Sequence, residues 1–593
     1  MNPALIDFAD PRAPQAPRLR SAFGAPRQIL AARSHDEVRP VLDAVEAAAR
    51  AGLWCLGWLA YEAAPAFDAA MRVHAAQGDL AWFAVYDAPA PWPQDGAQEM
   101  AAARITWSAG LARSAFDAAL EQIHAHIAAG RCYQVNFTAP MFGQLEGDAR
   151  ALFAALRRAQ PGGYAAHIDA GDGRQVLSVS PELFFDWRAA PDGSGAILTR
   201  PMKGTAARGA GAAEDAARER QLRESPKERA ENVMIVDLLR NDLSRIAQPG
   251  SVRVPRLLQT QALATVWQMT SDVQADTRAG TRLADVFAAL FPCGSVTGAP
   301  KIEAMRIIHA LEGGPRGVYC GALGLVQPDP QCGAGAVAAT FNVPIRTLQL
   351  QGRRVRCDVG SGIVWDAQPQ AEWREWAAKR AFAERASAPF ELLETLALHD
   401  GRHRHLPQHL ARLQRSAAHF GYPCDAQSLT DCLEGIARAH PTGLWRTRLL
   451  LDVQGRARAE AFALAATPVP VLLALAPRPF AFASSEFVRH KTTRREHYAA
   501  FAPEPDSGVF DTLLYNDDGE VTETTFGNVA ALLDGRWITP PEGCGLLPGV
   551  GRAVLLREGR LREGVLRLAD VPRVQEWAFV NSLRGWLPAR LQR

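Results

Sequence analysis

The sequence predicts a mixed α/β (α+β) protein made of several domains. At 593 residues the chain favours about three or four domain-sized units, each able to bury its own core. Short apolar runs at 53–61 and 80–86 have the length of strands, whereas the apolar residues of 116–130 are spaced as in a helix. A chain of this length has room for two enzymes.

We expect three segments. Residues 1–100 form the N-terminal part of a first module and end in a Pro-rich linker, residues 101–385 continue the mixed pattern, and residues 389–593 form a second unit. Within them we expect a strand at 133–138, a mobile loop or weak helix at 206–220, a helix at 370–384, a strand at 390–398, a turn at Asp400-Gly401 and a helix at 410–420.

A further helix is expected to begin at Ser225. Ser225 can cap it, Pro226 suits its first turn, and Glu228 would complete a capping box.

The composition excludes several classes of protein. A net charge of +2, 22% charged residues and the absence of basic runs interleaved with aromatics argue against a nucleic-acid partner. Nine cysteines without a Cys-x-x-Cys string argue against a disulfide framework and favour a reducing compartment. No apolar run approaches the length of a membrane span, and the first residues do not form a leader, so we expect a cytoplasmic protein.

Lysine usage points to two reactive sites. Only five of the 65 basic residues are lysines, and an amine that must lose a proton and attack carbon cannot be replaced by a guanidinium. Lys203 and Lys491 stand in the strings Arg-Pro-Met-Lys-Gly-Thr and His-Lys-Thr-Thr, far apart in the chain. That separation predicts two active sites.

Two carboxylate pairs, Glu228 with Glu231 and Glu372 with Glu375, each share a helix face. Four converging carboxylates need a cation between them, and an all-oxygen set suits Mg²⁺ holding a substrate carboxylate. Each pair also has a structural explanation that needs no metal. Glu228 is suited to capping its helix, and Glu375 is suited to a surface ion pair with Lys379.

Taken in order, nine strings between about 100 and 385 resemble the chorismate-utilising enzymes. They are Tyr133-Gln-Val-Asn136, Ser180-Pro-Glu182, Lys203-Gly-Thr205, Lys227-Glu-Arg-Ala-Glu-Asn232, Asp237-Leu-Leu-Arg-Asn-Asp242, Gly294 to Lys301, Arg346, Gly360-Ser-Gly362 and Glu372-Trp-Arg-Glu375. The resemblance implies a large α/β sandwich that holds Mg²⁺ and chorismate between its layers.

Lys203 distinguishes branches within that family. The anthranilate-forming branch has alanine in this string, and lysine resembles the branch that forms aminodeoxychorismate. The resemblance implies that Lys203 attacks ring carbon 2 while Glu182 protonates the departing 4-hydroxyl, and that ammonia then resolves the adduct at carbon 4. The family members that use water as nucleophile have a lysine base at the position of Gln134, whereas glutamine there resembles the members that use ammonia. The resemblance therefore disfavours water as the nucleophile.

The same comparison implies the remaining roles. Glu231 and Glu375 would touch Mg²⁺ directly, and Glu228 and Glu372 through water. The implied substrate-binding residues are Gln134, Gly204, Thr205, Gln268, Tyr319, Arg346, Gly360, Gly362 and Lys379. Gln268 departs from the histidine frequent in the family, so an acid-base role there is excluded, whereas a hydrogen bond to substrate is retained. Lys227 is expected to be a helix-surface cation, and Lys301 stays unassigned.

Ammonia needs a source. No cysteine lies in the Gly-x-Cys-x-Gly turn of a triad glutaminase, so we expect the glutamine amidotransferase to be a separate subunit.

The strings of 389–593 resemble the fold-type IV pyridoxal phosphate enzymes, a family of branched-chain transaminases and aminodeoxychorismate lyases. The matching strings are His409-Leu-Ala-Arg412, Gly519 to Asn528, Thr539-Pro-Pro and Leu547-Pro-Gly-Val-Gly-Arg552. This implies a domain of two subdomains in which Lys491 bonds the cofactor aldehyde and Glu523 holds its ring nitrogen protonated. The other implied cofactor-binding residues are Arg412, Asn528, Val550 and Gly551. Gly551 departs from the usual threonine, so one hydroxyl contact to phosphate is lost.

Lyase and transaminase share this apparatus. The string Asn581-Ser-Leu-Arg584 resembles the lyase branch, with Arg584 as a substrate-binding residue, and we favour a lyase acting on the product of the first site. We expect a bifunctional enzyme that converts chorismate to 4-aminobenzoate and pyruvate. The second unit is a candidate surface for a homodimer. Three alternatives stay open: an anthranilate-type synthase, an amino acid transaminase, and a non-catalytic scaffold for a glutaminase. Channelling, oligomeric state and amino acid regulation by residues 1–100 are not decided by the sequence.

Overall fold

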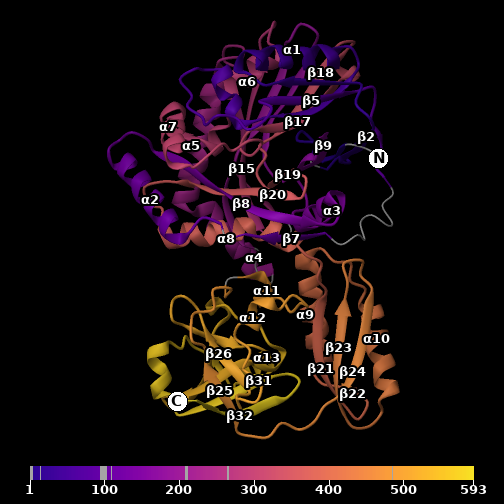
Figure 1. The fold of residues 1–593 in the computed structure, drawn as a ribbon, viewed down its shortest axis with the longest axis vertical. Helices are drawn as coiled ribbons and strands as arrows, with labels where there is room; N and C mark the ends of the chain where they lie inside the picture. Colours follow the sequence, from indigo (N-terminus) through magenta and orange to yellow (C-terminus); the bar gives the residue numbers. More distant parts are fainter. Residues whose placement is uncertain are drawn as a thin grey trace. The chain divides into compact units, whose positions relative to one another are not determined.

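The structure is a computed structural model that describes residues 4–13, 15–93, 103–108, 110–207, 212–262, 266–483 and 485–592. It divides into two compact units, Met1–Pro389 and Phe390–Arg593 (Figure 1). Helices and strands alternate in both units, so the expected mixed α/β class is confirmed.

Unit 1 contains two ten-stranded sheets whose described pairings are all antiparallel. The strands of the first sheet, in spatial order, are β16 (Gly298–Ala299), β8 (Gln134–Glu146), β20 (Arg354–Ile363), β19 (Thr347–Gln351), β10 (Arg174–Ser180), β9 (Tyr164–Gly171), β1 (Ala4–Phe8), β2 (Leu19–Phe23) and β6 (Ala90–Pro91), with β7 (Arg104–Trp107) beside β8. Those of the second sheet are β13 (Met202–Ala207), β15 (Val266–Thr277), β12 (Gly195–Arg200), β11 (Leu183–Ala189), β18 (Val337–Asn342), β17 (Ala322–Pro328), β4 (Trp54–Leu59), β5 (Ala81–Tyr86) and β3 (Gln28–Ala32), with β14 (Arg253–Ala262) beside β15.

The helices of unit 1 cover the outer faces of these sheets (Figure 1). They are α1 (His35–Arg50), α2 (Arg113–Ala128), α3 (Ala149–Ala159), α4 (Ala212–Glu224), α5 (Pro226–Ser244), α6 (Leu283–Leu290), α7 (Lys301–Leu311) and α8 (Pro369–Ala386), with short 3₁₀ turns η1 (Tyr61–Ala66), η2 (Gly294–Val296) and η3 (Pro330–Cys332).

One hydrophobic cluster joins the two sheets, because it contains side chains of β1 and β9 from the first and of β4, β5 and β17 from the second. A second cluster packs α1, α5 and α6 on the other face of the second sheet, and a third packs α3 and α8 on the first. Since both faces of these strands are covered, every residue of β1 and of β5 is buried. All residues of β5 are apolar or aromatic, and the one charged residue of β1, Asp7, pairs with Arg18 and Arg157.

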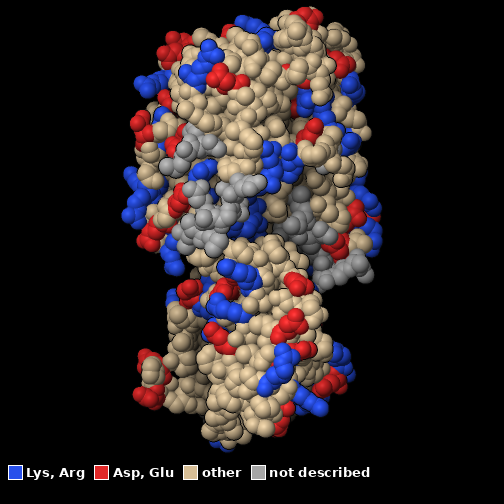
Figure 2. Space-filling view, turned by 90° about the vertical axis from the view of Figure 1, so that its right-hand side faces the viewer, with Lys and Arg blue, Asp and Glu red and all other residues tan. Residues whose placement is uncertain are grey.

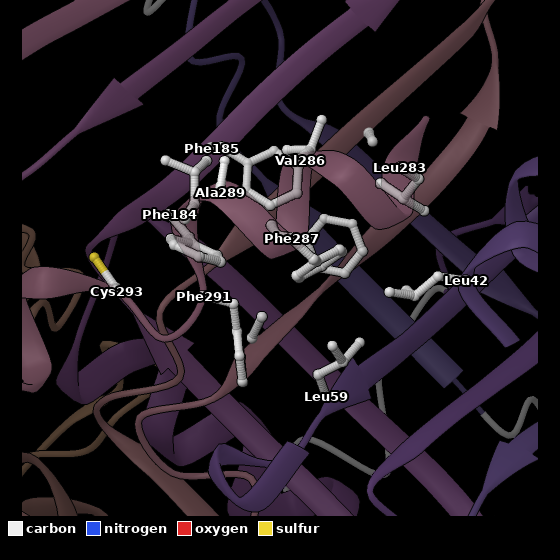
Figure 3. Packing of buried hydrophobic residues seen from close by; sticks show 14 of the residues in the cluster. Leu42, Leu59, Phe184, Phe185, Leu283, Val286, Phe287, Ala289, Phe291 and Cys293 are labelled. Atoms are coloured by element: carbon white, nitrogen blue, oxygen red, sulfur yellow. The ribbon is translucent and has the colours of Figure 1, made fainter. Parts of the chain in front are cut away.

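Aromatic packing anchors the turn that leads into the first candidate site. Phe184 and Phe185 from β11 meet Phe287 and Phe291 at the end of α6, with ring centroids 5.1 to 6.4 Å apart (Figure 3). Cys293 is buried at the end of this cluster, directly before η2. The turn at 294–296 therefore starts from a rigid base.

Unit 2 contains a four-stranded and an eight-stranded sheet. The first has the order β22 (Arg402–His403), β21 (Leu392–His399), β23 (Leu444–Leu451), β24 (Ala457–Ala463). The second has the order β27 (Val521–Thr524), β26 (Asp511–Tyr515), β25 (Val471–Leu475), β32 (Gly585–Leu591), β31 (Glu576–Asn581), β28 (Asn528–Leu533), β29 (Arg536–Thr539), β30 (Arg562–Glu563), and it mixes parallel with antiparallel pairs. The helices are α9 (Leu406–Phe420), α10 (Ala426–Ala439), α11 (Glu486–Arg489), α12 (Glu496–Ala499) and α13 (Val550–Arg557), with 3₁₀ turns η4 (Glu542–Cys544) and η5 (Leu568–Arg573).

The expected elements lie close to the observed ones, with two differences. The region 206–220 contains the end of β13 and most of α4, and residues 208–211 of it lie outside the described part of the chain. The capping box at α5 is only half formed: the Ser225 hydroxyl accepts from the Glu228 N–H at 3.4 Å, but the Glu228 carboxylate lies against Gly204 instead of returning to the cap.

Charged side chains of both signs are interspersed on the face shown in Figure 2. Among the described helices, none is long and apolar enough to cross a membrane.

Candidate active sites

The sequence-predicted residues of the first site lie where the end strands of both sheets of unit 1 meet α5, α8 and η2. Gln134 begins β8, Gly360 and Gly362 lie on β20, and Lys203 lies on the end strand β13. Glu182 occupies the crossover from β10 of the first sheet to β11 of the second. Residues distant in sequence are thus gathered at one end of the sandwich.

Lys203 and Glu182 are both positioned by η2. The Lys203 ammonium donates to the Ser295 carbonyl at 3.2 Å. Glu182 is buried, and burial raises the pKa of its carboxyl against the lowering effects of the Ser295 hydroxyl and the Lys203 charge. Within the described chain its Oε1 has no hydrogen-bond partner. A buried carboxyl of raised pKa beside an amine suits a proton donor paired with a nucleophile.

The backbone of Glu182 is held from both sides. Its N–H donates to the Ser180 hydroxyl at 3.2 Å, and its carbonyl accepts from the Val343 N–H at 3.1 Å. The Ser180 hydroxyl donates to the Val343 carbonyl at 2.6 Å, which closes the loop. The Ser-Pro-Glu string is therefore a fixed bridge between the two sheets.

Gln134 is fully buried, yet neither its amide nitrogen nor its oxygen has a hydrogen-bond partner among the described residues. Its side chain lies over Gly362, where an added Cβ would come within 1.9 Å of the amide nitrogen. Gly362 is thus needed for the close approach of Gln134, and the amide keeps its hydrogen-bonding capacity for a ligand.

Gly204, Thr205 and Gln268 form a second contact group beside Lys203. The Gln268 amide donates to the Gly204 carbonyl at 2.8 Å, and the Thr205 hydroxyl donates to the Gln268 oxygen at 3.1 Å. Gly204 has φ +85°, and an added Cβ would meet the Glu228 carboxylate at 3.0 Å. Gln268 therefore shapes the glycine loop through one donated and one accepted hydrogen bond.

The four predicted metal-binding glutamates are electrostatically coupled. Burial, together with the neighbouring carboxylates, raises the pKa of Glu228, Glu231 and Glu372. Glu375 differs, because its ion pair with Lys379 at 2.7 Å outweighs burial and lowers its pKa. The Ser361 hydroxyl donates to Glu372 at 2.6 Å.

Among the described residues, no three Asp, Glu, His or Cys side chains lie close enough together to hold a metal ion. The donor chemistry nevertheless fits a hard cation such as Mg²⁺, because all four groups are carboxylates that repel one another at one place. Binding of Mg²⁺ by Glu228, Glu231, Glu372 and Glu375 stays a prediction.

The remaining predicted residues of this site are Lys379 and Arg346, which donate to backbone carbonyls, and Tyr319, which is buried. The Lys379 ammonium donates to the Gly360 carbonyl at 2.9 Å, and the Arg346 guanidinium donates to the Lys379 carbonyl at 2.6 Å. Tyr319 is buried, which raises the pKa of its hydroxyl well above its usual range. Their contacts with a substrate carboxylate stay predictions.

The other two lysines of unit 1 have structural surroundings. Lys301, which had no assigned role, is held by Asp242 at 3.0 Å and by the Leu290 carbonyl at 3.2 Å. Lys227 is exposed on α5, as expected of a surface cation.

A buried arginine supports this site, and the sequence analysis missed it. Arg316 donates to the Val296 carbonyl at 2.8 Å and to the Asn136 carbonyl at 2.7 Å, and it pairs with Glu312 at 2.7 Å. It thereby ties η2 to β8, the elements that carry Ser295 and Gln134. Glu312 and Arg316 flank a Gly-Gly-Pro turn, where charged residues are ordinarily exposed, so the sequence did not mark this pair as buried.

The second candidate site, in unit 2, contains Lys491. Burial and the charges of Arg495 and Arg412 lower the pKa of Lys491 to about 7. Its carbonyl accepts from the Leu393 N–H at 3.0 Å, which fixes the lysine to the start of β21. About half of such an amine is neutral at pH 7, which suits it to attack an aldehyde.

Glu523 on β27 lies within electrostatic reach of Lys491. Burial raises the pKa of Glu523 to about 8, although three groups point donors at it. The Tyr498 hydroxyl donates to its Oε1 at 2.7 Å, and the Leu547 N–H and the Asn528 amide donate to its Oε2 at 3.1 and 3.4 Å. The three donors stabilise the ionised form against burial, and the positive charge of a protonated ring nitrogen would add to them.

Arg412 on α9 is held by a carboxylate that the sequence analysis missed. Its Nε and Nη2 donate to Glu394 at 2.8 and 2.7 Å, and its Nη1 donates to the Pro548 carbonyl at 3.2 Å. Burial alone would raise the pKa of Glu394, but Arg412 and His409 outweigh it and lower the pKa to about 2. A charged residue within the apolar sequence of β21 was the signal for Glu394.

The predicted phosphate-binding amides lie at the start of α13, where Val550 and Gly551 are the first two residues. A Cβ at Gly551 would meet the Asn581 carbonyl carbon at 2.7 Å and the Ser582 nitrogen at 2.9 Å. This close approach explains why the chain departs from threonine there. The first N–H groups of α13, the helix dipole and Arg412, which donates to the nearby Pro548 carbonyl, fit the phosphate of pyridoxal phosphate.

Arg584 lies in the turn between β31 and β32. Its backbone N–H donates to the Asn581 side chain at 2.7 Å, and its guanidinium contacts the Thr467 hydroxyl. Burial and the nearby charge of Arg446 lower the pKa of Arg584. A contact of Arg584 with substrate stays a prediction.

Comparison with known proteins supports both units. The chorismate binding enzyme family matches residues 12–385, and the amino-transferase class IV family matches residues 391–591. Aminodeoxychorismate synthase component 1 of Klebsiella aerogenes is 39% identical over 303 residues, which cover 50% of this chain and 62% of that protein. Anthranilate synthase component 1 of Streptomyces coelicolor is 38% identical over 269 residues, 45% of this chain and 50% of that protein.

This chain therefore matches about half to three fifths of the length of these two relatives. Among solved structures, a putative 2,3-dihydroxybenzoate-specific isochorismate synthase from Bacillus anthracis has a TM-score of 0.51 at 17% identity, covering 65% of this chain and 95% of that chain, which shows a shared fold. The first family model covers more than half of the sequence, and the second covers the unit that follows. The chain belongs to the chorismate binding enzyme family and carries an amino-transferase class IV domain after it.

Proposed function

We propose that the chain is a bifunctional enzyme that converts chorismate and ammonia to 4-aminobenzoate and pyruvate. Unit 1 would form 4-amino-4-deoxychorismate, and unit 2 would act as its lyase. The observation that carries the proposal is the placement of Lys203, whose amine is anchored to Ser295 beside the buried Glu182.

The first reaction uses side chains of unit 1. The Lys203 amine, once deprotonated, forms a bond to ring carbon 2 of chorismate. Both conjugated ring double bonds shift toward carbon 4, and the 4-hydroxyl departs as water with a proton from Glu182. Ammonia then adds at carbon 4, both double bonds shift back, and the bond to Lys203 breaks, with the proton released from ammonia returning to Glu182. Glu231 and Glu375, with Glu228 and Glu372 behind them, would hold Mg²⁺ against a substrate carboxylate.

The two relatives bear different names at nearly equal identity, so overall similarity does not choose between a 4-amino and a 2-amino product. Lys203 supports the 4-amino product, because a covalent bond at carbon 2 blocks ammonia there. A 2-amino product from the wild-type chain would reject this assignment.

The second reaction uses side chains of unit 2. Pyridoxal phosphate, when bound, supplies an electron sink for the amine substrate. Arg412 and the N–H groups of Val550 and Gly551 would hold its phosphate, and Glu523 would keep a proton on its ring nitrogen. Lys491 would take the proton from carbon 4, after which pyruvate departs from carbon 3 and the ring becomes aromatic. A transaminase, by contrast, needs a second keto acid for turnover.

Ammonia would come from a separate glutamine amidotransferase. The name component 1 of the Klebsiella relative is consistent with such a partner. High ammonium should therefore replace the partner in vitro.

Two single-site variants test the division of labour. Purified protein is incubated with chorismate, Mg²⁺, ammonium and pyridoxal phosphate. Lys491→Ala should consume chorismate and accumulate 4-amino-4-deoxychorismate, whereas Lys203→Ala should yield no 4-aminobenzoate. Mixing the two variants should restore 4-aminobenzoate, since each retains one intact unit. Failure of the mixture, with both variants folded, would contradict two independent sites that exchange a diffusible intermediate.

A further inference from the structure

Three arginines of unit 2 converge on one face of its four-stranded sheet. Arg446 on β23 lies directly opposite Ala397 of β21, and on the other side of that strand the N–H of Arg404 donates to the Ala397 carbonyl at 2.9 Å. Residues opposite one another on antiparallel strands project to the same face, so the side chains of Arg404 and Arg446 share it. Arg584 adjoins both. Burial and the charge of Arg446 lower its pKa, and the Arg404 guanidinium lies 3.3 Å from where a Cβ on the next residue, Gly585, would stand. Together the three residues form the arginine group.

The arginine group has no acidic partner. Within the described chain none of its members forms an ion pair with a carboxylate, whereas Arg458 on the neighbouring strand β24 is held by Glu391 at 2.9 Å. The Arg446 Nε is buried and has no hydrogen-bond partner among the described residues, while its guanidinium lies 4.8 Å from the centre of the Phe462 ring. A buried unsatisfied N–H and like charges at close range are both unfavourable until an anion binds.

An aromatic pair, Phe510 and Phe526, links the arginine group to the reactive lysine. At one end Arg584 lies 6.0 Å from the centre of the Phe510 ring, and the two phenylalanine rings are 5.2 Å apart. At the other end the carbonyl of the residue before Phe526 accepts from Arg495, and burial and the charge of Arg495 lower the pKa of Lys491. Phe526 is 43% exposed, so its ring is available to a flat apolar ligand.

We propose that Arg446 and Arg584 bind the ring carboxylate of the lyase substrate, with the substrate ring against Phe526, and that this contact determines specificity. The proposal rests on the lyase activity of the proposed function. 4-Amino-4-deoxychorismate carries its ring carboxylate across a six-membered ring from the amine, as 4-aminobenzoate does. An α-amino acid carries its carboxylate one carbon from the amine. Only the first class can place the amine at Lys491 and a carboxylate at the arginine group, where guanidinium forks match carboxylate oxygens.

The kinetic test uses the full-length holoenzyme with 4-amino-4-deoxychorismate as substrate. Arg446→Met retains an unbranched side chain over Phe462 but removes the charge, so KM should rise about 10- to 100-fold while kcat changes by less than about threefold. Arg446→Lys keeps the charge without the fork, and its KM should lie between those of the wild type and Arg446→Met. Arg458→Met, which removes the ion pair with Glu391, is the matched control and should leave KM within about twofold.

A binding test removes the dependence on turnover. 4-Aminobenzoate and 4-aminobenzamide share a ring and an amine and differ in the negative charge. Calorimetric titration of the wild-type holoenzyme should show at least about tenfold tighter binding of the acid, and Arg446→Met should abolish this preference. Binding of either ligand to unit 1 is the same in both proteins, so the difference between them reports unit 2.

The outcomes separate this inference from the proposed function. Turnover by the wild type with an unchanged KM in Arg446→Met would overturn the carboxylate contact and leave the lyase assignment intact. No turnover, together with a preference for the acid that depends on Arg446, would retain the contact and reject the lyase. If both the turnover and the preference are absent, both assignments are wrong. Thermal unfolding of each variant verifies that folded proteins are compared.

Discussion

Removal of one oxygen atom, in Tyr498→Phe, tests how strongly the Tyr498 hydroxyl stabilises the ionised form of Glu523. The Tyr498 hydroxyl donates to Glu523 at 2.7 Å, while its ring stacks on Phe480 at a centroid distance of 5.3 Å. The ring packing is retained in the variant, so the main loss is the hydrogen bond. A hydrogen bond to a charged group contributes about 1.5 to 3 kcal/mol, which corresponds to about one to two pKa units.

The sign follows from proton linkage. The pKa of Glu523 in the folded protein, about 8, lies above its usual value of 4.5. The folded state therefore binds the proton more tightly, and this contribution to stability is lost as pH rises from about 4.5 to 8. In Tyr498→Phe the loss continues to about pH 9 to 10. The destabilisation caused by the substitution should thus be nearly constant below pH 8 and grow by about 1 to 2 kcal/mol by pH 9.5.

The assay is the free energy of unfolding of unit 2 in the cofactor-free protein at pH 6, 8 and 9.5, from urea titrations read by hydrogen exchange of its core amides. Lys491 contributes the same pH dependence to both proteins, so it cancels in the difference. Tyr422→Phe is the matched control, because its hydroxyl donates to the neutral Phe390 carbonyl at 2.9 Å. A Tyr498→Phe effect of equal size at pH 6 and pH 9.5 would refute the reasoning.

Three further predictions concern the two sites. Lys203→Ala should reduce the 4-amino product to below about 1% of wild type and release some 2-aminobenzoate, which chromatography with fluorescence detection resolves; retention of the 4-amino product would exclude covalent catalysis by Lys203. Glu231→Gln should raise the half-saturating Mg²⁺ concentration by about tenfold or more, whereas Asp237→Asn, on the same helix but exposed, should leave it unchanged. Gly551→Thr should destabilise unit 2 by about 1 to 3 kcal/mol in urea titration, because its Cβ would meet the backbone of Asn581; unchanged stability would show that the turn yields easily.

Local patterns predicted the elements of the fold well. The apolar runs at 53–61 and 80–86 correspond to β4 and β5, and the helix expected at 370–384 is α8. The glutamate pairs lie on α5 and α8 as their spacing indicated, because residues three apart on a helix share a face whatever the tertiary structure is.

Long-range contacts were not predictable in the same way. The anchor of Lys203 is a carbonyl 92 residues away, and Arg316 joins β8 and η2 across 180 and 20 residues. Backbone acceptors carry no sequence signature, so nothing marked Ser295 or Val296 in advance. The half-formed capping box has the same origin, since Gly204 of a distant strand takes the space beside Glu228.

The most direct test of the central claim is an isotope experiment on the wild-type chain. Purified protein is incubated with chorismate, Mg²⁺, pyridoxal phosphate and ¹⁵N-ammonium, without a keto acid. The products are separated by chromatography, then identified and quantified by mass spectrometry. The account predicts ¹⁵N-labelled 4-aminobenzoate and pyruvate in equal amounts. Labelled 2-aminobenzoate, or labelled 4-amino-4-deoxychorismate that turns over only when a keto acid is added, would contradict it.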